Sequence, residues 1–157
     1  MLVILLFHVI IVVIETKGSR KQTPPEHFRR ARRGPPDTYY DGGCFHCTLS
    51  FPRDYPLSPP VMKFSKPLWH PNIYPNGKVC ISILHPPGED RFGYEKSCER
   101  WSPVQSVEKV LMSVISMLAE PNDMSPANVE AAKEWRSDRK KFSKHVDRDV
   151  RVSIGIA

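Results

Sequence analysis

The chain has 157 residues, of which 40% are hydrophobic and 25% are charged, a balance typical of one globular domain and not of a disordered or collagen-like chain. Its 16 prolines predict irregular connections between short elements and argue against a pure helical bundle. The net charge of +6 lies entirely within residues 17–33, so the remainder is neutral and nucleic acid is not an expected partner.

Residues 1–33 differ in character from the rest. The run from Leu2 to Ile14 is apolar except for His8, but it is shorter than the roughly 18–20 residues that span a bilayer as a helix. Only Met1 precedes it, so the basic start of a signal peptide is missing. Its β-branched residues also suit a buried strand. Three interpretations of this run remain open: membrane contact through residues 1–14, a buried strand, or a poorly packed extension. Residues 15–33 are predicted to be a linker.

The next part of the chain predicts short strands. Phe45, Cys47, Leu49 and Phe51 alternate with more polar residues, which indicates a half-buried strand. The proline-rich residues 52–60 end it, and residues 61–64 predict a second strand in a short antiparallel meander. A turn-rich segment, residues 69–77, then leads to an apolar segment that contains Cys80. Residues 85–100 are predicted to form a long surface loop.

Helices are predicted in the last third of the chain. Ser102 and Pro103 suit an N-cap and a first helical position, and apolar residues from Val104 to Leu118 then recur at helical spacing. Ser125 and Pro126 predict a second helix start, and residues 138–152 predict a third, more exposed helix. Strands followed by helices indicate an α+β fold.

The four cysteines, Cys44, Cys47, Cys80 and Cys98, are too few and too irregularly spaced for a disulfide framework, which favours a reducing compartment. Cys44 and Cys47 have the spacing of half a zinc site, but no second pair at ligand spacing follows. Buried thiols are the favoured interpretation, and no metal is expected.

Several motifs occur in order: FPRDYPLSPP, HPNIYPNGKVCISIL around Cys80, and ERWSPVQSVEKVL. Together they resemble the ubiquitin-conjugating enzymes from about Gly34 to Arg151. PGEDRFGYEKSCERW is similar to the acidic-loop insertion of the G-type subgroup. Members of that subgroup are associated with ubiquitin chains that send proteins to the proteasome and, for some, with degradation at the endoplasmic reticulum.

The resemblance implies a cysteine that accepts ubiquitin as a thioester from the activating enzyme and passes it to a lysine amine of a protein substrate, usually with a ubiquitin ligase. Cys80 matches that cysteine, and a thiol suits the chemistry because a thiolate both attacks and leaves readily. The partners implied are ubiquitin, the activating enzyme, a ligase and protein substrates. No cofactor is expected, because the ATP that is consumed belongs to the activating enzyme.

Other site residues follow from the same resemblance. His70, Pro71 and Asn72 match the HPN motif, in which the asparagine steadies an oxyanion or orders the nearby loop, whereas His70 is expected to be structural. His85 matches a subgroup histidine that tunes access or proton transfer. Ser125 lies where many relatives have an acidic residue, and Asp123 is close to it.

Two surfaces are also implied. For the acidic residues of the insertion, two roles are expected as alternatives: they orient acceptor ubiquitin, or they form an ordinary solvated charge run. These residues are Glu89, Asp90, Glu95 and Glu99. Ligase contact is expected at two loops, through Pro56, Leu57, Ser102 and Pro103. Leu57 is the expected anchor, with packing on its own domain as the alternative.

The N-terminal helix and first strand of the family are not recognisable in residues 1–33. We therefore expect an atypical extension, residues 1–33, and an N-terminally incomplete catalytic core, residues 34–157, in which a strand edge is exposed. An active conjugating enzyme is the leading hypothesis, ahead of an impaired ubiquitin- or ligase-binding relative and a membrane-associated variant. The expected location is the cytoplasm, with the nucleus or the cytosolic face of the endoplasmic reticulum as further locations.

Overall fold

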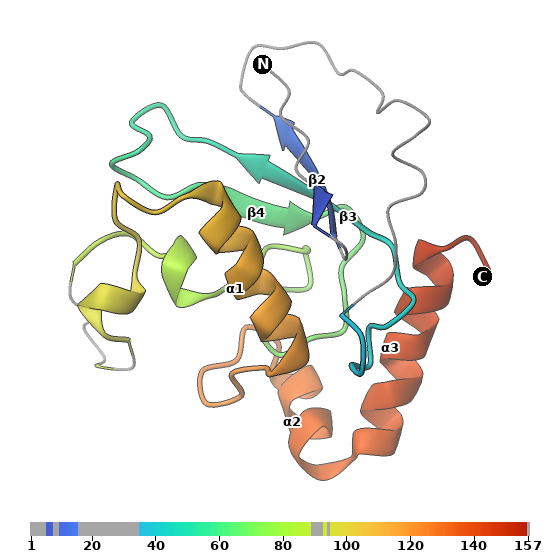
Figure 1. Ribbon diagram of the computed structural model, residues 1–157. Coiled ribbons are helices and arrows are strands. Elements are labelled where there is room, and N and C mark those ends of the chain that lie inside the picture. Colours follow the sequence, from blue (N-terminus) through green and yellow to red (C-terminus); the bar gives the residue numbers. More distant parts are fainter. Residues whose placement is uncertain (1–5, 8–9, 16–34, 89–92, 94, 157) are drawn as a thin grey trace.

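A computed structural model describes residues 6–7, 10–15, 35–88, 93 and 95–156. Within these residues one sheet is built from β1 (Leu6–Phe7), β2 (Ile10–Glu15), β3 (Phe45–Ser50) and β4 (Val61–Phe64), in that order. The helices are α1 (Val107–Ala119), α2 (Val129–Ser137) and α3 (Arg139–Ser153), with the short 3-10 helices η2 (Ser82–Leu84) and η3 (Ser97–Glu99) before them. In Figure 1, α1 crosses the sheet, and α2 and α3 pack against each other away from it. The predicted α+β class is confirmed.

The pairing of the strands agrees with the predicted antiparallel meander for β3 and β4 but not with the predicted exposed edge. β3 and β4 are antiparallel, as predicted, but β2 pairs with β3 in parallel, from Ile10 opposite Phe45 to Glu15 opposite Ser50. The prediction of an exposed edge on β3 is therefore wrong. A parallel pair needs a long connection, and the residues between β2 and β3 are numerous enough to provide one.

The apolar run at the start of the chain forms strands where it is described. Of the interpretations left open by its composition, the strand is the one found for Ile10–Glu15, whose β-branched residues favour extended backbone. In the part of the chain that the structure describes, no helix combines the length and apolar character that crossing a membrane requires.

The core lies between the sheet and α1. Phe45, Cys47 and Leu49 are buried, which confirms the predicted alternation, although β3 ends at Ser50 and not at Phe51. Val110, Leu111, Val114 and Leu118 of α1 join the same cluster. Cys47 thus serves as a buried apolar residue, and among the described residues no group of three or more potential ligands is arranged to hold a metal.

Two predicted helix starts are wrong. α1 begins at Val107, where Ser106 is the N-cap, because residues 102–105 instead form a turn closed by a bond from the Gln105 amide to the Ser102 carbonyl. Val104 is therefore 91% exposed and is no part of the helix stripe. α2 begins at Val129 with Asn128 as its N-cap.

The later start of α2 has a cause in the tertiary structure. The backbone amides of Ala127 and Asn128 both donate to the carbonyl oxygen of Pro71, at 2.8 and 2.9 Å. These bonds hold the segment with Ser125 and Pro126 against the HPN motif, so it cannot coil into a first helical turn. The third helix, Arg139–Ser153, begins and ends within one residue of its predicted range.

Candidate active site

Cys80 lies at the end of a segment that folds back along β4. The amide of Phe64 donates to the carbonyl oxygen of Gly77 at 2.9 Å, and the amide of Val79 donates to that of Met62 at 3.0 Å. Gly77 has a φ of +86°, and a Cβ there would lie 2.5 Å from the carbonyl oxygen of Phe64. Only glycine fits this close approach. The turn therefore fixes the position of Cys80 relative to the sheet.

His70 has a structural role. It is fully buried, its Nδ1 accepts a bond from the amide of Asn72 at 2.9 Å, and its Nε2 lies 3.0 Å from the carbonyl oxygen of Met117. Because Nδ1 accepts, the proton of the neutral ring is on Nε2, which donates to Met117. Burial lowers the pKa of His70 to about 4. The ring is thus a neutral link between the HPN motif and α1.

Asn72 joins two loops of the site through its side-chain amide. Its Nδ2 donates to the carbonyl oxygen of Asn122 at 2.6 Å, and its Oδ1 accepts from the amide of Asn122 at 2.8 Å. Its own carbonyl oxygen accepts a bond from the amide of Cys80 at 2.9 Å. This geometry matches the loop-ordering role among the two roles expected for this residue.

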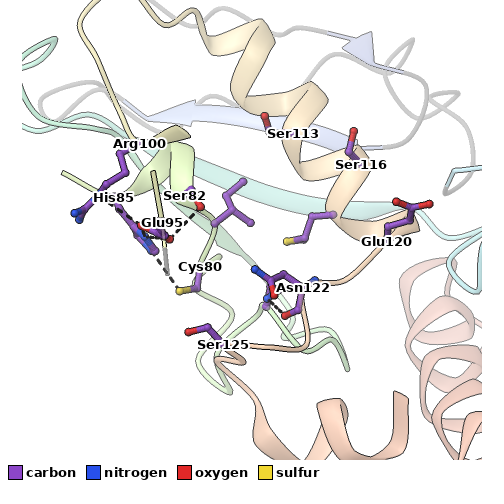
Figure 2. Close-up of a pocket in the computed structure, with 13 residues that line it drawn as sticks. Cys80, Ser82, His85, Glu95, Arg100, Ser113, Ser116, Glu120, Asn122 and Ser125 are labelled. Carbon is purple, nitrogen blue, oxygen red and sulfur yellow. Dashed lines mark hydrogen bonds and ion pairs between the residues drawn. The ribbon is translucent and has the colours of Figure 1, made fainter. Parts of the chain in front are cut away.

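A chain of polar contacts leads from Cys80 to the insertion. The Sγ atom of Cys80 lies 3.4 Å from Nε2 of His85, and Nδ1 of His85 lies 2.7 and 2.9 Å from the two carboxylate oxygens of Glu95. Ser82 donates to the same carboxylate at 3.0 Å, and Nε of Arg100 lies 3.5 Å from it. Figure 2 shows these side chains converging beside the cysteine.

These contacts change the acidity of both reactive groups. The hydrogen bond with His85 is the main cause that lowers the pKa of the Cys80 thiol, and a hydrogen bond from Tyr74 acts in the same direction, while partial burial opposes both. Hydrogen bonds with Cys80 first, and with Glu95, raise the pKa of His85 to about 9. The pair therefore favours a Cys80 thiolate next to a His85 imidazolium. The thiolate is the nucleophilic form of a cysteine.

A cavity of about 400 Å³ opens over these groups. Ser125 lines it together with Cys80, His85 and Asn72, so the residues that the motifs singled out lie together. Asp123 does not line it, because its carboxylate lies 3.3 Å from Nε of Arg136.

The insertion residues have different surroundings. Glu95 lines the cavity, and its side chain is 19% exposed, so it is not part of a solvated charge run. Glu99 is exposed and accepts a bond from the backbone amide of Lys96. Glu89 and Asp90 lie outside the described residues.

The two loops expected to contact a ligase meet through Trp101. Its indole Nε1 donates to the carbonyl oxygen of Pro56 at 2.8 Å. Leu57 is 66% exposed, so it does not pack on its own domain. Pro103 is exposed and Ser102 is partly buried in the neighbouring loop.

Four residues of the site were missed from the sequence: Tyr74, Ser82, Arg100, and Asn122, whose backbone bonds the side chain of Asn72. Tyr74 and Ser82 are six and two residues from Cys80, so proximity along the chain was an available signal. Arg100 had no such signal, because only the folded loop brings it to Glu95.

Comparison with known proteins identifies the family. The family model described as ubiquitin-conjugating enzyme matches residues 16–150. The chain belongs to the ubiquitin-conjugating enzyme family. It is therefore a transferase that carries ubiquitin as a thioester and works with ubiquitin, an activating enzyme and a ligase.

Relatives from distant organisms are closely similar to this conjugating enzyme. The chain is 64% identical over 121 residues to ubiquitin-conjugating enzyme E2 15 of Schizosaccharomyces pombe, covering 77% of the chain and 72% of the relative. It is 62% identical over 120 residues to E2 13 of Arabidopsis thaliana, covering 76% and 72%. It is 63% identical over 123 residues to E2 G2 of Homo sapiens, covering 78% and 74%. The G-type resemblance inferred from the insertion is thus confirmed.

Proposed function

We propose that Cys80 accepts ubiquitin as a thioester and that the enzyme passes it to lysine amines, building chains that direct proteins to proteasomal degradation. The observation that carries the proposal is the cavity in which the Cys80 sulfur lies 3.4 Å from His85. A half-buried thiol with a lowered pKa, open to a cavity, is suited to attack an acyl group.

Both steps balance with the groups present. In loading, the Cys80 thiolate attacks the carbonyl carbon of the thioester on the activating enzyme, a C–S bond forms, and the thiolate of the activating enzyme leaves. The proton of the His85 imidazolium passes to that thiolate or to solvent, which leaves His85 neutral. In transfer, the lysine nitrogen attacks the carbonyl carbon of the Cys80 thioester, a C–N bond forms, and Cys80 leaves as a thiolate. The proton of the amine goes to Nε2 of His85, the base nearest to the sulfur.

The remaining residues take supporting roles in this proposal. Asn72 keeps the loop of Asn122 and Ser125 beside the thioester through its two bonds to Asn122. Exposed Leu57 and Pro103 contact the ligase on the surface joined by Trp101. Acidic residues of the insertion, Glu89, Asp90 and Glu99, orient acceptor ubiquitin through its basic surface.

We also propose a location in the cytoplasm, with the nucleus and the cytosolic face of the endoplasmic reticulum as further sites. The alternative is a membrane-associated protein that contacts the bilayer through residues 1–14. Partitioning of the full chain and of a chain lacking residues 1–14 with lipid vesicles tests it, since unchanged partitioning after the deletion contradicts a membrane role for this segment.

Loading is the first test of the function. We expect the full chain, mixed with activating enzyme, ubiquitin and ATP, to form a ubiquitin adduct that reductant removes. Cys80→Ala abolishes the adduct, whereas Cys98→Ala keeps it, because Cys98 is exposed and lies outside the cavity. Non-reducing electrophoresis with and without reductant measures both.

An adduct that persists in Cys80→Ala, or no adduct from wild-type protein shown to be folded, contradicts the proposal. The second outcome favours the impaired binding relative, for which ubiquitin or ligase binding would remain. Chain building is tested with the loaded enzyme and ubiquitin whose lysines are changed to arginine, which we expect to stop ladders longer than one added ubiquitin.

A further inference from the structure

The carboxylate of Glu95 holds His85 from the side opposite Cys80. Both of its oxygens are within 2.9 Å of Nδ1 of His85. The carboxylate is itself held by the hydroxyl of Ser82 at 3.0 Å and by Nε of Arg100 at 3.5 Å. Glu95 comes from the insertion, while Cys80, Ser82 and His85 come from the segment around η2. Figure 2 shows Cys80, His85 and Glu95 in a row, with His85 in contact with both of the others.

This arrangement determines how the imidazole is oriented. A carboxylate accepts hydrogen bonds, so Nδ1 of His85 must carry a proton in both the neutral and the charged ring. Nε2 is then the atom that faces the sulfur, and it is the atom that gains or loses a proton. The third member of a nucleophile, base and carboxylate series orients the base in the same way in other enzymes.

The charged and titratable groups that face this pair come from several segments. Tyr74 contacts Cys80 from the HPN segment, Arg100 contacts Glu95 from beyond η3, and Glu120 lines the same cavity at the end of α1. Glu95 acts on the thiol in two opposite ways. Through space its negative charge raises the pKa of Cys80, whereas through His85 it supports the imidazolium that lowers the pKa.

We propose that Glu95 is a positioning residue, which fixes His85 over Cys80 and so makes thiolate formation depend on the acidic insertion. The proposal rests on the proposed function only in taking Cys80 as the loading cysteine; the contact itself does not depend on it. When Cys80 is esterified its negative charge is lost, and His85 loses the hydrogen bond that most raises its pKa. His85 then loses its proton more readily than in the free enzyme, and the neutral ring, still held by Glu95, can receive the proton of the incoming amine.

The test measures the acidity of Cys80 without ubiquitin. The full chain is alkylated with iodoacetamide from about pH 5 to about pH 10, and the Cys80 peptide is quantified by mass spectrometry, so the other three cysteines do not interfere. Glu95→Gln keeps the shape of the side chain and its bond to Ser82 but removes the charge. Glu108→Gln, an exposed glutamate in the first turn of α1, is the control.

We expect Glu95→Gln to move the pH midpoint of Cys80 alkylation upward and to slow alkylation at pH 7 roughly threefold or more, while Glu108→Gln leaves both unchanged. In a His85→Gln background the same Glu95→Gln change should move the midpoint downward or leave it in place. Only the through-space repulsion remains there. This reversal distinguishes a residue that acts through His85 from one that only supports the loop.

A wild-type midpoint in Glu95→Gln overturns the proposal, and so does an equal upward shift in the His85→Gln background. Nitrogen NMR of the His85 ring gives a second readout, in which Glu95→Gln should lower the pH at which the ring titrates. Thermal unfolding of each variant shows whether it is folded. Failure of Cys80 to load ubiquitin would overturn the proposed function and leave these titrations as they are.

Discussion

The same residue type has opposite chemistry at two positions of this chain. Cys47 is fully buried in β3, and burial raises the pKa of its thiol, so it stays protonated and inert. Cys80 is half-buried beside His85, whose hydrogen bond lowers the pKa of its thiol. The environment, and not the residue type, determines which thiol is a nucleophile.

The two histidines differ in the same way, and His70 gives a prediction. The pKa of His70 is about 4 in the folded protein and near its ordinary value of 6.5 when unfolded. The unfolded chain therefore binds the proton first. The contribution of the neutral ring to the free energy of unfolding is fully present above about pH 6.5 and is lost as the pH falls towards about 4. For a pKa shift of this size the loss is up to about 3 kcal/mol.

Urea unfolding at several pH values measures this dependence. We expect His70→Gln to show a flatter fall in the free energy of unfolding between about pH 6.5 and about pH 4 than the wild type. His46→Gln, which changes an exposed histidine in β3, should keep the wild-type slope. Equal slopes in all three proteins would contradict the prediction.

At the scale of elements, the segment before the HPN motif is attached to α2 and α3 by a polar cluster around the buried side chain of Glu134. The indole of Trp69 donates to Glu134 at 2.7 Å, and the amide of Trp69 donates to Asp149 at 2.6 Å. Lys141 and His145 of α3 lie 2.9 and 3.0 Å from the carboxylate of Glu134. One glutamate thus connects a loop and two helices, so the active-site loop is supported by the last third of the chain.

Loss of Glu134 is therefore expected to be costly. Glu134→Ala leaves the Trp69 indole without its acceptor and should lower the free energy of unfolding by about 1–3 kcal/mol. Glu130→Ala on the same helix removes only an exposed pair with Lys133 and should cost about 0.5 kcal/mol or less. Equal urea midpoints for the two variants would show that the cluster adds nothing to stability.

At the scale of the whole molecule, residues 10–15 complete the sheet that carries the site. β2 covers the edge of β3 along its full length, and the segment before Cys80 covers β4 on the other side through the bridge between Lys63 and Lys78. The central strands are therefore paired on both sides. An uncovered edge would offer unpaired backbone groups to other chains.

Deleting residues 1–15 should lower the thermal midpoint and increase self-association, because it uncovers β3. A chain lacking only residues 1–5, which keeps both β1 and β2, is the matched control. Circular dichroism during heating and size-exclusion chromatography measure the two effects. If the two deletions behave alike, β2 does not contribute to the stability of the sheet.

The sequence by itself determined the α+β class, the alternation of β3, the end of the last helix and the grouping of Cys80, Asn72, His85 and Ser125 at one site. The elements follow from local periodicity, and the site residues follow from the resemblance of several motifs to the ubiquitin-conjugating enzymes, since Ser125 is distant from Cys80 along the chain. It also predicted that His70 is structural. The starts of α1 and α2 could not be predicted, because turn bonds and the carbonyl of Pro71 compete with the caps that the sequence offers.

Only the tertiary structure decided the rest. The parallel pairing of β2 with β3 joins segments separated by some thirty residues, and no local pattern specifies that pairing. The contact between Glu95 and His85 likewise depends on how a long polar loop folds back, which has no periodicity to reveal it. Local propensity reports what a segment prefers, whereas pairing and proton transfer depend on which groups the whole fold brings within hydrogen-bond distance.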